Sequence, residues 1–334
     1  MPRTGPGPLT GPATAPSRYG SARARCPTAT STLAPTGWPT ASSPAESAPR
    51  VSSRALDRSV ELIVAVLGVL KTGAAVLPLD IGYPAARLAT VLTDARPELL
   101  LTAPHIDLPE TPALTRINLP APEGAHDARP ATDPTDEDRT TPVRPAHLAY
   151  VIYISGSTGT PKPVAVTRAG LANLTAHLAD ALRVPATSRV LQFASPGFDA
   201  FFAETGMALT AGATLVLAPA RRLLPGPELA RLAADQRISH LSVPPAALGV
   251  MAPDALRDVG TLIVAGEACG AVLATAWARN RTLINGCGPT GTTVCATMSD
   301  ALRPGDGTPP LGAPPRAAHT CRSSTHACAP FRRA

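Results

Sequence analysis

Apolar positions follow two alternating periods along the middle of the chain. Residues 57–73 place apolar side chains at helical spacing and end at Gly73, which predicts a helix. The run 74–80 that follows is short and almost continuously apolar, which predicts a buried strand. The same alternation continues to residue 285. We expect further helices over 84–95, 168–182, 198–209, 227–236, 244–251 and 268–280. We expect further strands over 98–102, 148–154, 189–194, 213–218, 238–243, 261–266 and 282–285.

This order of elements predicts the fold class. Strands that are apolar throughout are buried on both faces, and a helix between successive strands lets them run parallel. We therefore predict an α/β protein with mostly parallel sheets, flanked by helices on both faces. Residues 103–147 are rich in Pro, Thr and Asp and are expected to form an irregular connection. In such folds, functional groups gather where the strands end.

The two ends of the chain differ from its middle. Residues 1–54 contain ten prolines, no isoleucine and little apolar periodicity, and residues 313–334 have the same character. Such segments bury too little apolar surface to offset the entropy of ordering. We predict that both ends are disordered or non-native low-complexity segments. Residues 55–312 are then the folded domain.

Charge and cysteine content restrict the class of protein. The two end segments carry +5 and +4 of the net charge of +6, which leaves −3 for residues 55–312. A basic surface for nucleic acid or membrane is therefore not expected on the folded part. The longest apolar run, 62–70, is too short to span a bilayer. Six cysteines without a CxxC pair indicate reduced thiols, so we predict a cytoplasmic protein.

One possible metal motif lies in the C-terminal segment. His319, Cys321, His326 and Cys328 form two HxC pairs, whose side chains are zinc ligands in other proteins. No folded element is expected to hold them, and ligand sites depend on folding. We therefore predict no metal site formed by side chains alone.

The segment YISGSTGTPKPVAVT, residues 153–167, directly follows a predicted strand. Gly156 and Gly159 allow successive backbone N–H groups to face one point, the hydroxyl residues add donors, and Lys162 adds a positive charge. Such a set can bind a phosphate chain. The spacing does not fit GxxxxGK[ST], so an ordinary P-loop is disfavoured. A flexible solvent loop is the alternative interpretation.

This segment resembles the phosphate-binding signature of the adenylate-forming, AMP-binding superfamily, and most of all that of adenylation domains of nonribosomal peptide synthetases. Further matches follow in the family's order: LKTGAAVLPLD (70–80), FDAFFAETGMALTAGATLVL (198–217), LIVAGEAC (262–269) and INGCGPTGTTVCAT (284–297). The resemblance covers about residues 55–312. It implies an AMP-forming ligase that activates an amino acid with ATP as an aminoacyl-adenylate. A peptidyl carrier protein would then accept the acyl group on its phosphopantetheine thiol.

The resemblance also assigns roles to nucleotide-binding residues. Lys162 and Thr290 match catalytic positions, and Thr290 also matches the contact to the α-phosphate. The remaining pyrophosphate-binding residues would be Ser155, Gly156, Ser157, Thr158 and Gly159. The residues that hold adenine would be Gly266, Glu267, Asn285, Gly286 and Cys287.

Asp199 matches the residue that pairs with the α-ammonium of an amino-acid substrate. A carboxylate in an apolar pocket requires such a cation. The alternative is a helix N-cap, a position that Asp favours. The side-chain pocket would be lined by small or apolar residues, namely Ala200, Ala203, Ser242, Ile263, Ala265, Gly286, Val294 and Cys295. Such a lining suits a bulky apolar or aromatic amino acid, although ordinary core packing is the alternative for each residue.

Departures from the family pattern predict weak or lost activity. Ile154 replaces a threonine and Pro163 replaces a glycine of the loop. Cys287 replaces the aromatic residue that stacks on adenine. Gly291 replaces the glutamate that holds Mg²⁺, so ATP is expected as cofactor with a weakened Mg²⁺ site.

Family features expected after residue 314 are also not legible: a ribose-binding aspartate, a hinge and a small domain with a catalytic lysine. Two alternatives therefore stay open. One is a non-catalytic remnant with weak or no nucleotide binding. The other is an acyl- or aryl-CoA ligase, against which Asp199 argues because those acids carry no ammonium group.

Overall fold

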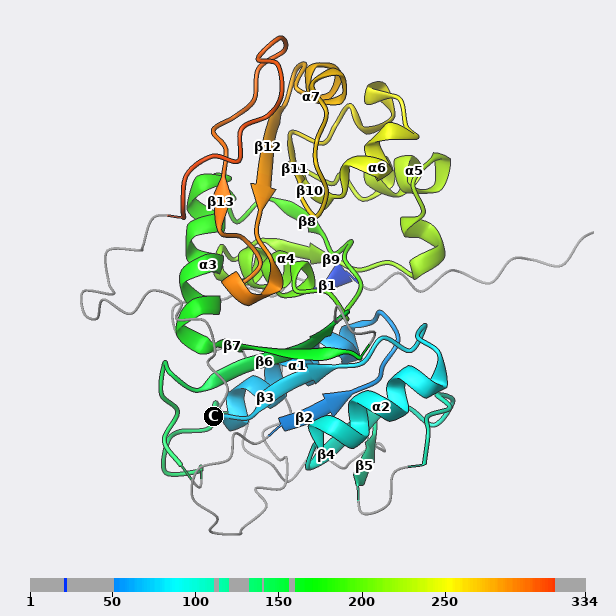
Figure 1. Cartoon of the computed structure of the whole chain (residues 1–334), viewed down its shortest axis with the longest axis vertical. Coiled ribbons are helices and arrows are strands. Elements are labelled where there is room, and N and C mark those ends of the chain that lie inside the picture. The colour runs from blue at the N-terminus through cyan, green and yellow to red at the C-terminus, as the bar shows by residue number, and fades with distance from the viewer. Residues whose placement is uncertain are drawn as a thin grey trace, which may run out of the picture.

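The computed structural model describes residues 21–22, 51–110, 114–119, 132–139, 141–155 and 160–315. Two sheets separate three layers of helices, so that the order through the molecule is helix, sheet, helices, sheet, helices (Figure 1). This arrangement confirms the predicted α/β class with mostly parallel sheets covered on both faces.

The first sheet has the strand order β5-β4-β2-β3-β6-β7. Neighbouring strands pair in parallel except β6 and β7, which form an antiparallel hairpin at the edge. The strands are β2 (Val51–Arg54), β3 (Ala75–Pro78), β4 (Leu99–Thr102), β5 (Thr115–Asn118), β6 (Leu148–Ile154) and β7 (Lys162–Thr167).

The second sheet has the order β1-β9-β8-β10-β11-β12-β13. Its five central strands are parallel, and an antiparallel strand lies at each edge. The strands are β1 (Ser21–Ala22), β8 (Arg189–Leu191), β9 (Thr214–Val216), β10 (His240–Val243), β11 (Thr261–Val264), β12 (Thr282–Cys287) and β13 (Thr297–Met298).

The helices fall into three groups. The group between the sheets consists of α1 (Val60–Thr72), α3 (Arg168–Ala181) and α4 (Ala200–Thr210). The outer face of the first sheet is covered by α2 (Ala85–Ala95). The outer face of the second is covered by α5 (Pro227–Asp235), α6 (Pro245–Gly249) and α7 (Ala271–Trp277). Short 3-10 turns are η1 (Ala220–Leu223), η2 (Pro253–Leu256) and η3 (Thr290–Thr292).

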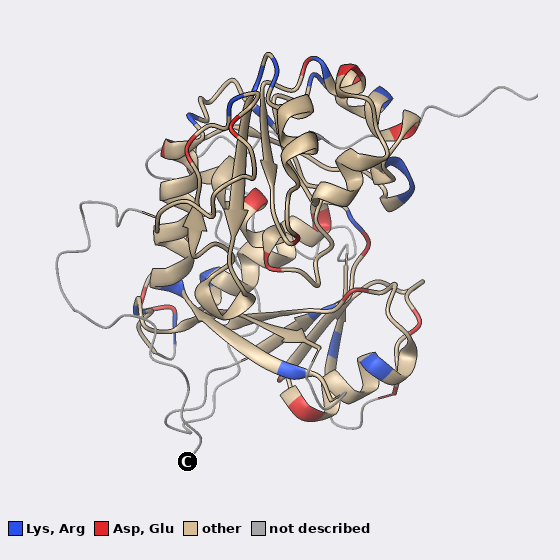
Figure 2. Cartoon of the chain, turned by 45° about the horizontal axis from the view of Figure 1, so that its top comes forward, with Lys and Arg blue, Asp and Glu red and all other residues tan. Residues whose placement is uncertain are grey.

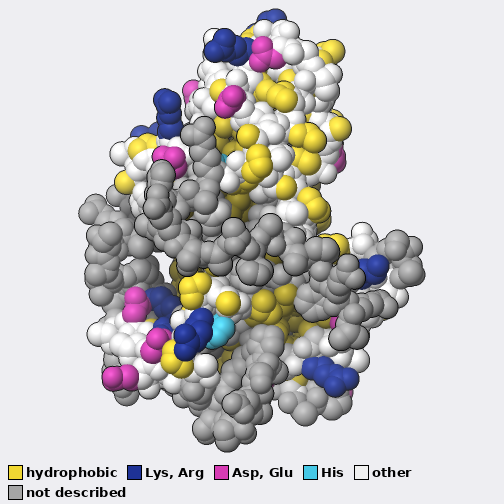
Figure 3. All heavy atoms as spheres, turned by 60° about the vertical axis from the view of Figure 1, so that its left-hand side comes forward, with side chains coloured by type: hydrophobic (Ala, Val, Ile, Leu, Met, Phe, Trp, Pro, Cys, Tyr) yellow, Lys and Arg dark blue, Asp and Glu magenta, His cyan; other side chains and the backbone are white. Residues whose placement is uncertain are grey.

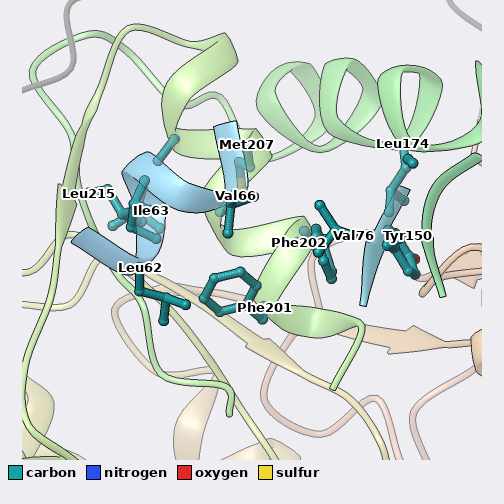
Figure 4. Close-up of a cluster of buried hydrophobic side chains, with 14 of the residues drawn as sticks. Leu62, Ile63, Val66, Val76, Tyr150, Leu174, Phe201, Phe202, Met207 and Leu215 are labelled. Carbon is teal, nitrogen blue, oxygen red and sulfur yellow. The ribbon is translucent and has the colours of Figure 1, made fainter. Parts of the chain in front are cut away.

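The central helix layer joins the two sheets through one apolar core. Tyr150 of β6 stacks on Phe202 of α4 with ring centroids 4.1 Å apart and ring planes 10° apart. Phe201 meets Phe202 edge-on at 5.3 Å. Figure 4 shows these rings among aliphatic side chains of α1 and α3. Aromatic pairs of this kind contribute beyond their buried area, so α4 is firmly placed between the sheets.

Five strands were not predicted, among them β1 (Ser21–Ala22) in the segment expected to be disordered and β13 (Thr297–Met298) after the last predicted strand. Val51–Arg54 lies in the segment expected to be disordered, yet it forms β2 between β4 and β3. Its Ser52, Ser53 and Arg54 are buried polar residues, which hide the usual apolar signal of a central strand. Strand β5 lies within the expected irregular connection, and β7 contains Pro163, which an edge strand tolerates.

The described surface gives a mixed distribution of charge. Figure 2 shows Lys, Arg, Asp and Glu mainly at the ends of elements and in loops. The face drawn in Figure 3 carries its described charged side chains in small separate groups between apolar and neutral ones. Within the described ranges, no helix is both long enough and apolar enough to cross a membrane.

Candidate functional site

The glycine-rich segment connects the two strands of the edge hairpin. Ile154 at the end of β6 lies opposite Lys162 at the start of β7. Ser155 and Lys162 are exposed at the two ends of the connection. The intervening residues, Gly156, Ser157, Thr158 and Gly159, lie outside the described residues. The phosphate-binding role of this loop therefore stays a prediction.

Asp199 and Thr290 come together although they are far apart in sequence. The Thr290 hydroxyl in η3 lies near the Asp199 carboxylate, close enough to lower its pKa. Burial raises the pKa of Asp199, and the Thr290 hydroxyl opposes this rise. Asp199 holds the N-cap position of α4 but makes no side-chain capping hydrogen bond. Backbone N–H groups of Asp199 and Ala200 at the start of α4 also lower its pKa, so both the helix-cap and the pocket interpretations stay predictions.

The same turn brings the edge hairpin close to Asp199. Helical turn η3 lies beside β7, whose first residue is Lys162. Burial and the charge of Asp199 together raise the pKa of Tyr150 on β6. Tyr150 pairs with Val166, whereas the described ends of the glycine-rich loop lie four residues further along β6, so Asp199 and Thr290 lie beside the part of the hairpin away from that loop.

Several residues predicted to line the side-chain pocket are mutual neighbours. A Cβ atom placed on Gly286 would lie 3.6 Å from Sγ of Cys295, 3.7 Å from Cγ2 of Ile263 and 3.8 Å from Cβ of Ala265. Ser242 on β10 pairs with Ile263 on β11. The ends of three adjacent strands thus contribute to one apolar surface.

The other predicted pocket residues adjoin this surface. Ala203 is buried in the core that includes Ile263, and Val294 and Cys295 pack against that core. Burial raises the pKa of Cys295, and the nearby charges of Cys287 and Asp199 add to this rise. Ala200 directly follows Asp199 as the first residue of α4. Their contact with a substrate side chain therefore stays a prediction.

The residues predicted to hold adenine lie at the ends of two paired strands. Val264 of β11 lies opposite Asn285 of β12, so the segments beyond them leave the sheet side by side. Gly266 turns the chain with φ 88°, a value that favours glycine. Glu267 and Cys287 are exposed there. The Asn285 side chain is buried and donates from Nδ2 to the Pro310 carbonyl at 2.9 Å, so this amide is engaged within the chain.

The turn after β12 is tightly constrained. A Cβ on Gly288 would lie 2.5 Å from the backbone nitrogen of Ala296, so a side chain cannot be accommodated. Thr293 and Val294 have φ values of 61° and 66°, which are rare for β-branched residues. Strain of this kind is found at functional sites. Gly291 differs from Gly288, because a Cβ placed on it would have no atom within 4 Å.

One network in this region had been assigned no role from the sequence. Glu204 of α4 is 2% exposed and accepts hydrogen bonds from Phe193 N at 3.0 Å, Ala194 N at 3.0 Å and Gln192 Nε2 at 3.1 Å. Arg58 donates to Gln192 Oε1 at 2.8 Å and to the Phe193 carbonyl at 2.9 Å. Burial raises the pKa of Glu204 to about 8, and these hydrogen bonds and the Arg58 charge oppose the rise. A glutamate within the apolar run FDAFFAETGMAL is the sequence signal for such a site.

A bound Mg²⁺ ion would find little support from this set of side chains. Mg²⁺ usually takes one or two carboxylates together with substrate phosphates. Position 291 supplies no carboxylate, and the described residues contain no group of three or more His, Cys, Asp or Glu that could hold a metal. The residues present therefore do not fit a well-held Mg²⁺ ion at this position.

The chain belongs to the AMP-binding enzyme family, whose sequence model matches residues 53–320. It is 51% identical over 261 residues to novobiocin biosynthesis protein H of Streptomyces niveus, covering 77% of this chain and 43% of that protein. It is 43% identical over 273 residues to chondramide synthase cmdD of Chondromyces crocatus, covering 78% of this chain and 7% of that protein. The chain thus spans less than half the length of these curated relatives.

The fold is similar to that of solved nonribosomal peptide synthetases. The AMPPNP-bound form of FmoA3 (S1046A) matches with a TM-score of 0.67 and 27% identity, covering 80% of this chain and 29% of that one. Its form with bound alpha-methyl-L-serine-AMP matches with a TM-score of 0.67 and 26% identity, covering 80% and 30%. The predicted membership of the adenylate-forming superfamily is confirmed. These matches do not favour the non-catalytic remnant or the CoA ligase.

Proposed function

We propose that this chain carries the core of an adenylation domain, which activates an amino acid with ATP as an aminoacyl-adenylate. One observation carries the proposal: the contact between Asp199 and Thr290. It joins the residue expected to bind the substrate ammonium to the residue expected to touch the α-phosphate. Nucleotide and amino-acid-adenylate complexes of FmoA3 support this assignment.

Each group has a definite task in this reaction. Asp199, half-buried and raised in pKa by desolvation, gains a compensating charge when it accepts the α-ammonium. The substrate carboxylate is then held near Thr290, where it attacks the α-phosphorus and displaces pyrophosphate. We assign the loop 155–162, with Lys162, to the pyrophosphate. Positioning and charge neutralisation are the main contributions that a protein makes to such a transfer.

The proposal includes a substrate class and partners. The surface around Gly286, with Ile263, Ala265 and Cys295, is apolar and suits a bulky apolar or aromatic side chain. A peptidyl carrier protein is the expected acceptor of the activated group. The cytoplasm is the expected compartment, since Cys269, Cys287 and Cys295 are free thiols.

Weak activity is expected because of two residues. Cys287 offers no ring for adenine, and loss of stacking costs about 1–3 kcal/mol by analogy with base–aromatic stacking. Gly291 offers no carboxylate to Mg²⁺, so phosphate charge is less well neutralised. Both residues are exposed: Cys287 is the last residue of β12, and Gly291 lies in η3, the turn that follows.

Amino-acid-dependent ATP–pyrophosphate exchange tests the proposal. We expect a low exchange signal with apolar or aromatic amino acids, and we expect this signal to disappear in Asp199→Asn. It should persist in the control variant Asp258→Asn, because Asp258 is an exposed residue in the loop before β11. Calorimetry with ATP and Mg²⁺ accompanies the assay. Absence of both exchange and nucleotide binding in the unaltered protein would refute the proposal. Acyl-CoA formation from an acid without an ammonium group, unchanged in Asp199→Asn, would instead indicate a CoA ligase.

A further inference from the structure

The segment 192–199 connects β8 to α4 and ends at Asp199. Its first part is fixed by Arg58, which donates to backbone and side-chain oxygens of Gln192 and Phe193, and by Glu204, which accepts from their neighbouring N–H groups. The polar backbone groups of this part are thus largely satisfied by two side chains. The part nearer to Asp199 is fixed by different residues.

Asp80, two residues after the end of β3 in the first sheet, holds this second part. The Ser195 hydroxyl donates a hydrogen bond to the Asp80 carboxylate. The same hydroxyl oxygen accepts from the Gly197 N–H at 3.1 Å, and the Phe198 N–H donates to the Ser195 carbonyl at 2.9 Å. Asp80 is itself fixed, because its carboxylate also accepts from the Gly82 N–H at 2.8 Å. One half-buried carboxylate therefore organises the turn that leads into Asp199.

Tyr83 supports the same turn from the side. A Cβ atom on Gly197 would lie 2.9 Å from the Tyr83 hydroxyl oxygen and 3.4 Å from two ring carbons, so the tyrosine ring lies against the Gly197 backbone. Arg87 of α2 places its guanidinium 4.3 Å from the centre of the Tyr83 ring and supports the ring by a cation–π contact. Phe198 is 59% exposed and therefore gives the turn little support of its own.

We propose that Asp80 and Tyr83 are positioning residues for the amino-acid site. They fix Ser195 and Gly197 so that Asp199 faces Thr290 before the substrate arrives. Without them the segment must be ordered at each binding event, and the entropy of ordering weakens binding. This inference rests on the proposed function, since it concerns the carboxylate that would bind the substrate ammonium.

The inference predicts a selective kinetic effect. Asp80→Asn and Ser195→Ala should each raise KM for the amino acid about tenfold and leave KM for ATP within about twofold, because the altered turn leads to Asp199 only. The double variant should be no worse than the stronger single variant, since both act through one hydrogen bond. Asp138→Asn is the matched control: Asp138 accepts from the Thr135 hydroxyl at 2.9 Å on an exposed loop elsewhere.

Amide hydrogen exchange gives a readout that does not depend on activity. In Asp80→Asn we expect the Gly197 and Phe198 amides to exchange at least tenfold faster, with exchange in α4 unchanged. Gly197→Ala should have the same effects by displacing the Tyr83 ring. Tyr83→Phe removes the hydroxyl oxygen that would lie 2.9 Å from the new Cβ atom. The double variant Gly197→Ala/Tyr83→Phe should therefore show slower amide exchange and a lower KM for the amino acid than Gly197→Ala alone.

The outcomes separate the inference from the proposed function. Unchanged amide exchange in Asp80→Asn overturns the positioning role, whatever the activity. An equal rise of both KM values also overturns it, because the effect would then be general. If the unaltered protein shows no ATP–pyrophosphate exchange, the proposed function fails. Faster amide hydrogen exchange in Asp80→Asn would still show that Asp80 holds segment 192–199 in place.

Discussion

Substitution of Gly206 by alanine should destabilise the protein, although alanine is the better helix former. Gly206 lies on α4 where this helix crosses α3. A Cβ atom on Gly206 would lie 2.2 Å from Cγ2 and 3.1 Å from Cβ of Thr175. Ordinary carbon contacts lie at about 3.5–4.0 Å. The two helices must therefore move apart, or Thr175 must rotate.

Rotation of Thr175 is not free. The residue is 5% exposed, and its hydroxyl donates to the Ala172 carbonyl at 3.2 Å. Overpacking of this kind costs about 1–3 kcal/mol. The higher helix propensity of alanine returns about 1 kcal/mol. We expect a net loss of up to about 2 kcal/mol in the free energy of unfolding.

Urea denaturation measures this loss, with an unchanged m-value showing that only stability has changed. Thr175→Ser removes Cγ2 and keeps the hydroxyl, so Gly206→Ala should be neutral or stabilising in that background. A loss of the same size in both backgrounds would refute the steric argument. Because α4 begins directly after Asp199, the single variant should also raise KM for the amino acid.

Three further predictions concern individual side chains of the site and core. Gly291→Glu should tighten Mg²⁺-dependent ATP binding about tenfold in calorimetry, because its Cβ meets open space and the new carboxylate can reach the metal; Gly291→Gln is the uncharged control. Burial raises the pKa of Glu204 to about 8. Its contribution to the free energy of unfolding is therefore complete below about pH 4.5 and is lost as pH rises towards 8. In this window the free energy of unfolding should fall by up to about 1.4 kcal/mol per pH unit. Glu204→Gln should remove this slope from unfolding free energies measured between pH 5 and 8, and parallel curves would contradict the assignment. Arg54→Met should raise the free energy of unfolding by about 1–4 kcal/mol, because the Arg54 guanidinium is buried and has no hydrogen-bond partner among the described residues. A lower urea midpoint in the variant would contradict this and show that Arg54 does have a stabilising partner.

The sequence predicted those elements whose burial follows a simple period. Helix α1 and strand β6 are examples, because their apolar residues face a core or are covered on both sides. Strand β2 could not be found in this way. Its Ser53 is buried in the sheet and donates to the Leu99 carbonyl at 3.1 Å, so a polar residue is satisfied by a partner that is distant in sequence. Periodicity carries no information on such pairs.

The site was predicted in part for a different reason. Asp199 and Thr290 lie on separate elements, and their contact was expected only because each matched a family motif. The hydrogen bond between Asp80 and Ser195 was not expected, although Asp80 also lies in a recognised motif. Motifs indicate which residues recur together, but they do not state which atoms meet. That information requires the packing of the two sheets.

This packing changes how the candidate site should be understood. The residues predicted to contact an amino acid lie on the second sheet and on α4, whereas Asp80 and Tyr83 follow a strand of the first sheet. The position of Asp199 therefore depends on both sheets at once. A substitution on the first sheet can weaken amino-acid binding without altering any residue of the apolar pocket. Under the proposed function, affinity for an amino acid would depend on how the sheets are joined, and the size of the predicted pocket alone would not determine it.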